Sequence, residues 1–385
     1  MKKTENLVKI RPQRWVVKLG SSVVTGNGKG IHNGAIDDYA NQIESLLEAG
    51  FEIIIVSSGS IAEGIRRLGW SNRPSHINQL QAAAAAGQVG LTRAYENAFE
   101  KFGKLTAQIL LTHEDFSNRK RYLNSRSTML SLLKNNVVLI INENDTVATE
   151  EIKVGDNDTL AAMVANQLGA DLLVILTDKC GIYDCDPDLY PQAQLIDFVY
   201  ASDKKLSRVS SGSTSKYGVG GMATKIRAAK IAASGGANTL ITSGFEKDIL
   251  LRLSSGEELG TFVKADVPKL KARKQWLSSQ LKIKGTFVLD EGAIEAIYRN
   301  GKSLLPIGVL EVIGNFDRGD AVLCTTSNRK KIAIGLTNYS SIDSTKIIGQ
   351  TSSVIESLIG FVEEPELIHR DNLTLTDSNS SFENT

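Results

Sequence analysis

The stretch from Asn142 to Asp158 carries the densest set of side chains that could bind a small polar molecule. It holds six carboxylates against one base, Lys153, with three amide side chains among them. An apolar run from Val137 to Asn142 precedes it, and apolar residues at helical spacing follow it. Open α/β sheets place ligands in such loops, and carboxylates beside neutral amides suit a zwitterionic ligand. The alternative is that Asp156 and Asp158 only cap the following helix and that the remaining acids are solvated.

Two lysines stand at positions where a positive charge could meet an anion. Lys18 interrupts an apolar strand just before a glycine turn, and Lys225 ends the stretch GVGGMATK, which opens a helix. Glycines let the backbone approach an anion closely, and a helix amino terminus directs N–H groups at it. Lys225 opposes the dipole of its own helix, which suggests a function. The alternative for both residues is a solvated surface lysine.

A P-loop is excluded. Gly301-Lys302-Ser303 resembles the end of that motif, but Ala296 stands where its first glycine must be.

Buried strands alternating with helices must position these side chains. Apolar runs predict strands at Arg14–Leu19, Phe51–Val56, Leu105–Leu111, Val137–Asn142, Asp171–Leu176 and Ala237–Thr242. Because these runs are apolar on both faces, they predict an α/β fold with a mainly parallel sheet covered by helices on both sides. Glycine and serine recur where the strands end, so several loops should converge on one edge of the sheet.

The length of 385 residues and a change of character after Val263 predict more than one domain. Residues 1–263 form the first domain in this prediction. Lys264 to Lys284 holds seven basic residues and one acid, and we assign residues 264–282 to a basic linker. Short β-branched segments broken by glycine predict a small β-rich domain at residues 283–361. Residues 362–385 are expected to be a polar carboxyl-terminal tail.

The composition is that of an ordinary soluble protein, with 42% hydrophobic residues and a net charge of +1. No apolar run approaches the ~20 residues that span a bilayer, so we expect a cytoplasmic protein without a membrane partner. The three cysteines and four histidines are not spaced as a disulfide framework or a zinc site.

Five stretches, in this order, resemble the signature motifs of the amino acid kinase family. They are VVKLGSS from Val16, IVSSGSIAEG from Ile55, INENDTVATEEIKVGDND from Ile141, LTDKCGIYDCDP from Leu176, and GVGGMATK from Gly218. The segment from Gly285 to Gly360 resembles a PUA domain. The resemblance therefore covers nearly the whole chain.

The resemblance implies a three-layer αβα sandwich followed by a PUA-like domain. It implies ATP-dependent phosphorylation of the side-chain carboxylate of L-glutamate to L-glutamyl 5-phosphate, the first step of L-proline biosynthesis, with Mg²⁺ as cofactor and feedback inhibition by L-proline.

The same resemblance assigns roles to individual residues. Lys18 and Lys225 are the expected phosphoryl-transfer lysines, and Asp158 positions them. Glutamate is expected to bind at Ser58, Asn142, Asp145, Asp156 and Asn157. ATP is expected to bind at Lys18, Thr177, Asp178, Val219, Gly220, Gly221, Met222, Ala223, Thr224 and Lys225. No metal ligand is assigned.

The chemistry of this reaction suits the residues. A glutamate carboxylate, with a pKa of ~4.3, is already ionised at neutral pH and needs no general base. The obstacle is the repulsion between this anion and the terminal phosphate of ATP. Positioning of the two groups and nearby positive charge reduce this barrier. Lysines should therefore meet the reacting end of glutamate, and the acidic loop its α-ammonium.

Two alternatives remain open. Related kinases that act on acetylglutamate, aspartate, carbamate or UMP share the fold, although an acidic loop that binds a free amine argues against the acetylated and nucleotide substrates. The PUA-like domain and basic linker would also fit an RNA-binding protein, but no aromatic stacking set accompanies the basic residues, so we do not expect RNA. The expected partners are L-glutamate, ATP, L-proline, further copies of the chain in a homo-oligomer, and glutamyl phosphate reductase downstream.

Overall fold

The computed structural model describes residues 13–25, 30–148, 157–206, 209, 221–266 and 283–376. The chain divides into two compact units. One comprises Met1–Phe116 and Arg126–Lys269, and the other comprises Ser117–Ser125 and Leu270–Thr385. In the described part of the chain, no helix is both long and apolar enough to cross a membrane.

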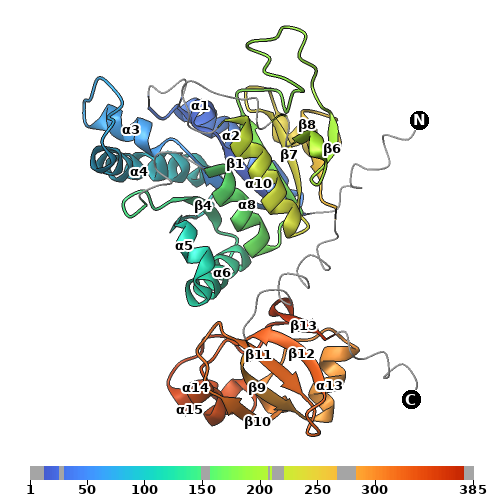
Figure 1. Ribbon diagram of the computed structural model, residues 1–385. Helices are drawn as coiled ribbons and strands as arrows, with labels where there is room; N and C mark the ends of the chain where they lie inside the picture. The colour runs from blue at the N-terminus through green and yellow to red at the C-terminus, as the bar shows by residue number, and fades with distance from the viewer. Residues whose placement is uncertain are drawn as a thin grey trace. The chain divides into compact units, whose positions relative to one another are not determined.

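The first unit is built on an eight-stranded sheet (Figure 1). From one edge to the other, its strands are β3 (Thr106–Leu111), β4 (Val138–Glu143), β2 (Glu52–Ser57), β1 (Arg14–Leu19), β5 (Leu172–Thr177), β7 (Asn238–Ser243), β8 (Thr261–Lys264) and β6 (Phe198–Tyr200). All neighbouring strands are parallel except β7 and β8. The sheet is therefore mainly parallel, as predicted, and each of the six predicted strands is present.

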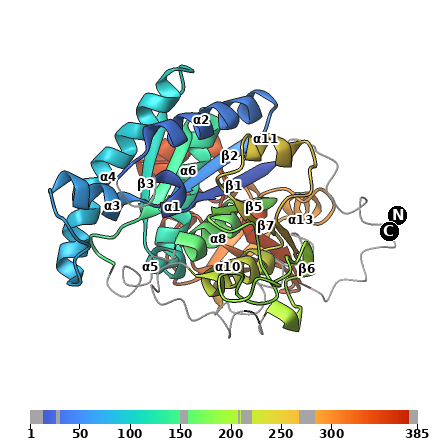
Figure 2. The same ribbon diagram turned by 90° about the horizontal axis from the view of Figure 1, so that it is seen from above.

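Helices cover both faces of this sheet, because its strands are apolar on both sides. Alternate residues of β1 enter different cores: Val16 packs in one, while Trp15 and Val17 pack in the other. The first core is closed by α6 (Arg119–Lys134), α8 (Asn157–Leu168) and α10 (Met222–Ser234), and the second by α1 (Ser21–Val24), α2 (Asn33–Glu48), α4 (Ile77–Glu100) and α11 (Ile249–Ser254). Figure 2 shows α2 and α11 on one side of β1 and β5, and α8 and α10 on the other. This confirms the three-layer αβα prediction.

The helices α3 (Ser60–Arg67) and α4 pack closely against each other because each has a glycine at the contact. A Cβ atom at Gly64 would lie 1.7 Å from the carbonyl oxygen of Ala83 in α4. A Cβ atom at Gly87 would lie 1.8 Å from the carbonyl oxygen of Ser60. No side chain fits at either point, so the two backbones touch and the amino terminus of α3 is fixed against α4.

The second unit has a five-stranded sheet in the order β10 (Val309–Gly314), β9 (Ile283–Leu289), β11 (Ala321–Thr325), β12 (Lys331–Leu336) and β13 (Leu373–Leu375). Strands β9 and β11 are parallel, and the other neighbouring strands are antiparallel. The helices α13 (Glu291–Tyr298), α14 (Ser341–Ile347) and α15 (Ile355–Ile359) accompany it. A core around Phe287 and Tyr339 holds this β-rich unit together, as predicted.

Three predicted boundaries are wrong. The small domain does not end at residue 361, because Leu367 and Ile368 are fully buried in its core and Leu373–Leu375 pairs with β12. Lys264 belongs to β8 rather than to the linker. Glu143 is the buried last residue of β4, whereas the predicted strand ended at Asn142. The end of the small domain was missed because the segment after residue 361 is mostly polar, although it contains Leu367 and Ile368.

The contact between α3 and α4 predicts that Gly87→Ala destabilises the chain by about 3 kcal/mol, because the new methyl group meets backbone that cannot move alone. Urea unfolding followed by circular dichroism measures this change. Gly292→Ala, in helix α13, is the matched control. Its Cβ would find its nearest atom at 3.6 Å, so this variant should be neutral or slightly stabilising. Equal stability of the two variants would contradict the proposed close contact.

Candidate active site

A buried carboxylate, Asp158, joins two buried lysines at the centre of the first unit. The Lys18 Nζ atom lies 2.6 Å from Asp158 Oδ1, and the Lys225 Nζ atom lies 3.2 Å from Asp158 Oδ2. The Thr224 hydroxyl also donates to Asp158 Oδ2, at 2.8 Å. The three charged side chains are between 1% and 7% exposed, so this is a single cluster shielded from water.

Three elements bring these charges together. Lys18 lies on β1 and points to the same face of the sheet as Val16, where α8 and α10 pack. Asp158 is in the first turn of α8, where the helix dipole favours a negative charge, and Lys225 is in the first turn of α10. The unfavourable position of Lys225 at a helix amino terminus is therefore offset by Asp158.

The protonation state of Asp158 follows from its neighbours. Burial alone would raise the pKa of this carboxyl, but the charges of Lys18 and Lys225 and the hydrogen bond from Thr224 outweigh it and hold the pKa well below its usual range. Asp158 is therefore ionised throughout the physiological pH range and keeps both lysines in place.

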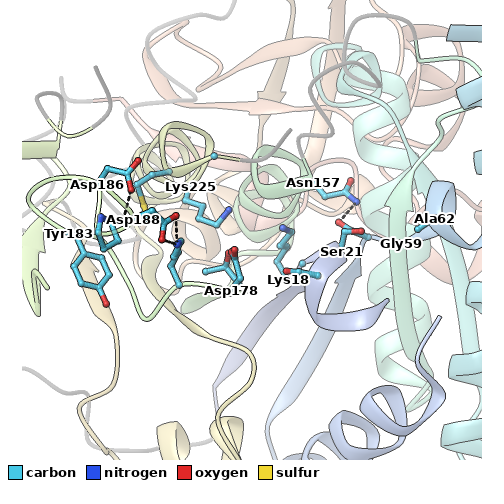
Figure 3. Close-up of a pocket in the computed structure, with 18 of the residues that line it drawn as sticks. Lys18, Ser21, Gly59, Ala62, Asn157, Asp178, Tyr183, Asp186, Asp188 and Lys225 are labelled. Carbon is cyan, nitrogen blue, oxygen red and sulfur yellow. Dashed lines mark hydrogen bonds and ion pairs between the residues drawn. The ribbon is translucent and has the colours of Figure 1, made fainter. Parts of the chain in front are cut away.

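The cluster opens on a cavity of about 680 Å³. In Figure 3, Lys18 and Asp178 lie between two ends of this cavity, one marked by Asn157 and Gly59 and the other by Tyr183 and Asp186. Its wall comes from the segments that follow β1, β2, β4 and β5 and from the start of α10. The carboxyl ends of parallel strands thus form the site, as the sequence predicted.

One end of the cavity is lined by amide and hydroxyl groups. Asn157 Nδ2 lies 3.0 Å from Ser58 Oγ and 2.9 Å from Asn142 Oδ1, and it is also 3.2 Å from the carbonyl oxygen of Ser57. Asn142 is itself fixed by Gln88, at 2.8 Å. Asn142 does not line the cavity and instead accepts a hydrogen bond that orients Asn157.

Two acids, Asp145 and Glu143, lie at the same end of the cavity. Ser60 Oγ donates to Asp145 Oδ2 at 3.3 Å. Burial, and then the charge of Glu143, raise the pKa of Asp145 to about 7, although the Ser60 hydroxyl and Arg73 act in the opposite direction. Asp145 is therefore close to half-ionised at neutral pH when the site is empty, and a cationic ligand would favour its charged form.

The cavity also contains part of the predicted ATP-binding set. Thr177, Asp178, Gly221 and Met222 line it, together with Lys18 and Lys225. Thr224 binds Asp158 instead, and Ala223 does not line the cavity. Asp156, Val219 and Gly220 lie outside the described residues.

Sequence reasoning missed some of the lining residues. Tyr183 and Lys179 lie within the motif LTDKCGIYDCDP, so this motif could have indicated that both residues line the cavity. Arg73 gave no signal, because it follows α3 in an irregular segment without a pattern.

Comparison with known proteins gives the class of this protein. The amino acid kinase family matches residues 13–243 and the PUA domain matches residues 285–359. The chain belongs to the amino acid kinase family. It is 53% identical to glutamate 5-kinase from Pseudomonas entomophila over 94% of this chain and 98% of that protein. It is likewise 53% identical to glutamate 5-kinase from Methylococcus capsulatus, over 94% of this chain and 97% of that protein.

Among solved structures, the chain is similar to UMP kinase from Ureaplasma parvum. The identity is 18%, the TM-score is 0.46, and the match covers 66% of this chain and 99% of that one.

The buried cluster predicts that Asp158→Asn destabilises the chain by about 3–5 kcal/mol, because it leaves two buried ammonium groups facing each other. Urea unfolding measures the change. Asp37→Asn is the matched control, since Asp37 pairs with Lys101 at 2.7 Å on the surface, where both side chains are at least 40% exposed. That variant should lose less than about 1 kcal/mol. A similar loss in both variants would contradict the special position of Asp158.

Proposed function

We propose that the chain is a glutamate 5-kinase, which transfers the terminal phosphoryl group of ATP to the side-chain carboxylate of L-glutamate and so makes L-glutamyl 5-phosphate, the first step of L-proline biosynthesis. The observation that carries this proposal is the pair of lysines, Lys18 and Lys225, which Asp158 holds on the wall of one cavity. Acids and amides line one end of this cavity, and residues of the predicted nucleotide-binding motifs line the rest.

The polarity of the cavity fits glutamate. Asp145 and the free carbonyl oxygen of the Asn157 side chain would accept hydrogen bonds from the α-ammonium group. Lys18 would attract the γ-carboxylate. The phosphates of ATP would approach Lys225 and the first turn of α10. A substrate with opposite charges at its two ends is thus oriented with its reacting carboxylate toward ATP.

Catalysis in this proposal needs no proton transfer to the enzyme, because the attacking carboxylate is already ionised. Asp158 stays ionised and holds both lysine side chains beside the cavity. Their ammonium groups neutralise the negative charge that develops in the transition state on the oxygens of the transferred phosphoryl group and on the leaving ADP. Burial strengthens this effect, since little water screens the charges.

Mg²⁺ fits this site as an ion carried by ATP. Within the described ranges, no three His, Cys, Asp or Glu side chains are grouped to hold a metal. Mg²⁺ usually binds phosphates, waters and one or two carboxylates, and Asp178 is a carboxylate on the cavity wall. The ion would neutralise phosphate charge during transfer.

Further partners belong to the same proposal. L-proline has the α-carboxylate and amine of glutamate but lacks the reacting carboxylate, so it would compete at the acidic end of the cavity. We also propose that the chain forms a homo-oligomer and that its unstable acyl phosphate passes to glutamyl phosphate reductase.

Trapping of the product tests the proposed function directly. The purified chain, with ATP and Mg²⁺, should form a hydroxamate from hydroxylamine in the presence of L-glutamate and not with N-acetylglutamate or aspartate. With UMP, whose phosphorylation gives no acyl phosphate, it should release no ADP. Hydroxamate formation with another of these substrates, or none with glutamate, would refute the assignment.

Lys18→Ala and Lys225→Ala should each lower kcat by about 10²–10³ while changing the KM for glutamate much less, because their charges matter most as the phosphoryl group moves. Steady-state kinetics of ADP release measures both constants. Lys101→Ala, which removes a lysine from a surface ion pair, is the control and should leave kcat unchanged. A kcat like that of the unmodified chain in either cavity variant would remove that lysine from the mechanism.

The raised pKa of Asp145, about 7, predicts a pH-dependent KM. Asp145 is mostly neutral at pH 6 and mostly ionised at pH 8, while the glutamate ammonium stays charged. The KM for glutamate should therefore fall about ten-fold from pH 6 to pH 8. In Asp145→Asn the KM should be high and independent of pH over this range. A KM that rises with pH, or the same profile in both proteins, would contradict the role of Asp145.

A further inference from the structure

The acidic end of the cavity has a positive side chain, Arg73, to which neither the motifs nor the reaction assigns a task. It lies between α3 and α4 and lines the cavity together with Ser60, Ile61 and Ala62, the first residues of α3. We propose that Arg73 binds the α-carboxylate of the amino acid substrate and makes the enzyme specific for free α-amino acids. This inference rests on the proposed function, since it names how the same substrate is recognised.

The backbone beside Arg73 already favours an anion. Gly59 adopts a left-handed conformation, with φ of +107°, which turns the chain from the end of β2 into α3. No side chain caps the amino terminus of α3. Its first N–H groups therefore add positive potential at the cavity wall. The glycine contacts with α4 fix this helix end in position.

Charges of both signs lie at this end of the cavity. Asp145 accepts a hydrogen bond from Ser60, at the start of α3, and the charges of Asp145 and Arg73 attract each other. Burial lowers the pKa of Arg73, but a guanidinium remains charged at any physiological pH. A carboxylate and a guanidinium at one end of a pocket match the ammonium and the carboxylate that share the α-carbon of an amino acid.

A second observation points to a ligand at this end. Asn157 is 8% exposed and lines the cavity, and its Oδ1 atom has no hydrogen-bond partner in the described protein. A buried acceptor of this kind is satisfied by a donor from a bound molecule, which the α-ammonium supplies. With the ammonium between Asn157 and Asp145, and the γ-carboxylate toward Lys18, Arg73 and the amino terminus of α3 are left for the α-carboxylate.

A different role for Arg73 gives a different result. If Arg73 only tuned the charge of Asp145, its loss would affect every ligand that carries the α-ammonium. If it binds the α-carboxylate, its loss affects only ligands that carry that group. L-Isoglutamine separates the two roles, because it keeps the ammonium and the γ-carboxylate but has a neutral carboxamide in place of the α-carboxylate.

The experiment compares Arg73→Met with the unmodified chain, using KM for L-glutamate and the inhibition constant of L-isoglutamine as a competitor of glutamate. We expect Arg73→Met to raise the KM for glutamate about 10- to 100-fold, the usual effect of losing a hydrogen bond between two charged groups. The inhibition constant of isoglutamine should change less than about two-fold. Arg73→Lys should recover part of the lost affinity, since the charge remains.

Arg67→Met is the matched control. Arg67 is exposed at the end of α3 and does not line the cavity, so this variant should keep both constants. An equal rise of both constants in Arg73→Met, or no rise in either, would overturn the proposal. Failure of the proposed function is a separate result, because the unmodified chain would then form no hydroxamate from glutamate.

Discussion

The attraction between one buried carboxylate and two buried lysines is the constraint on which the site depends. Each charge alone would be costly in a core that excludes water, and the three are tolerated only together. Because Asp158, Lys18 and Lys225 come from α8, β1 and α10, the cluster can form only when the sheet and both helices are in register. The chemistry of the protein and the correct packing of its first core are thus linked through the same atoms.

This linkage also explains how the cavity is divided. Both lysines pair with Asp158, and their side chains are at most 7% exposed. The acids Asp145 and Glu143 line the cavity toward Ser60, at the start of α3, rather than beside the cluster. If they stood beside the lysines, they would pair with them and leave no positive charge for phosphate. In the proposed function, this separation of the two kinds of charge along one cavity would orient a zwitterion.

Much of the fold was predictable from the sequence, because strands buried on both faces are nearly continuous apolar runs, as at Phe51–Val56. The motifs around Lys18, Asn157 and Lys225 were predictable for a different reason. Glycine turns, and charged residues at unfavourable positions in a strand or helix, can be recognised from a few neighbouring residues. The position of Arg73 was not predictable, because a loop arginine acquires its neighbours only from the packing of α3 on α4. The burial of Glu143 was also missed, since a charged residue at a strand end is ordinarily solvated. The short strands β6 and β8 were missed because they are too brief to show a pattern.

The glycine contacts between α3 and α4 restrict how this enzyme can move. Gly64 and Gly87 leave no gap into which either helix could slide, so α3 and α4 should behave as one rigid body. Any closure over a bound amino acid would then need rotation of this pair as a whole or movement of the connecting segment that carries Arg73. A hinge within the first turn of α3 is excluded by the same backbone contacts. The amino terminus of α3 is therefore held in one position against α4, and little conformational entropy would be lost there if a ligand bound.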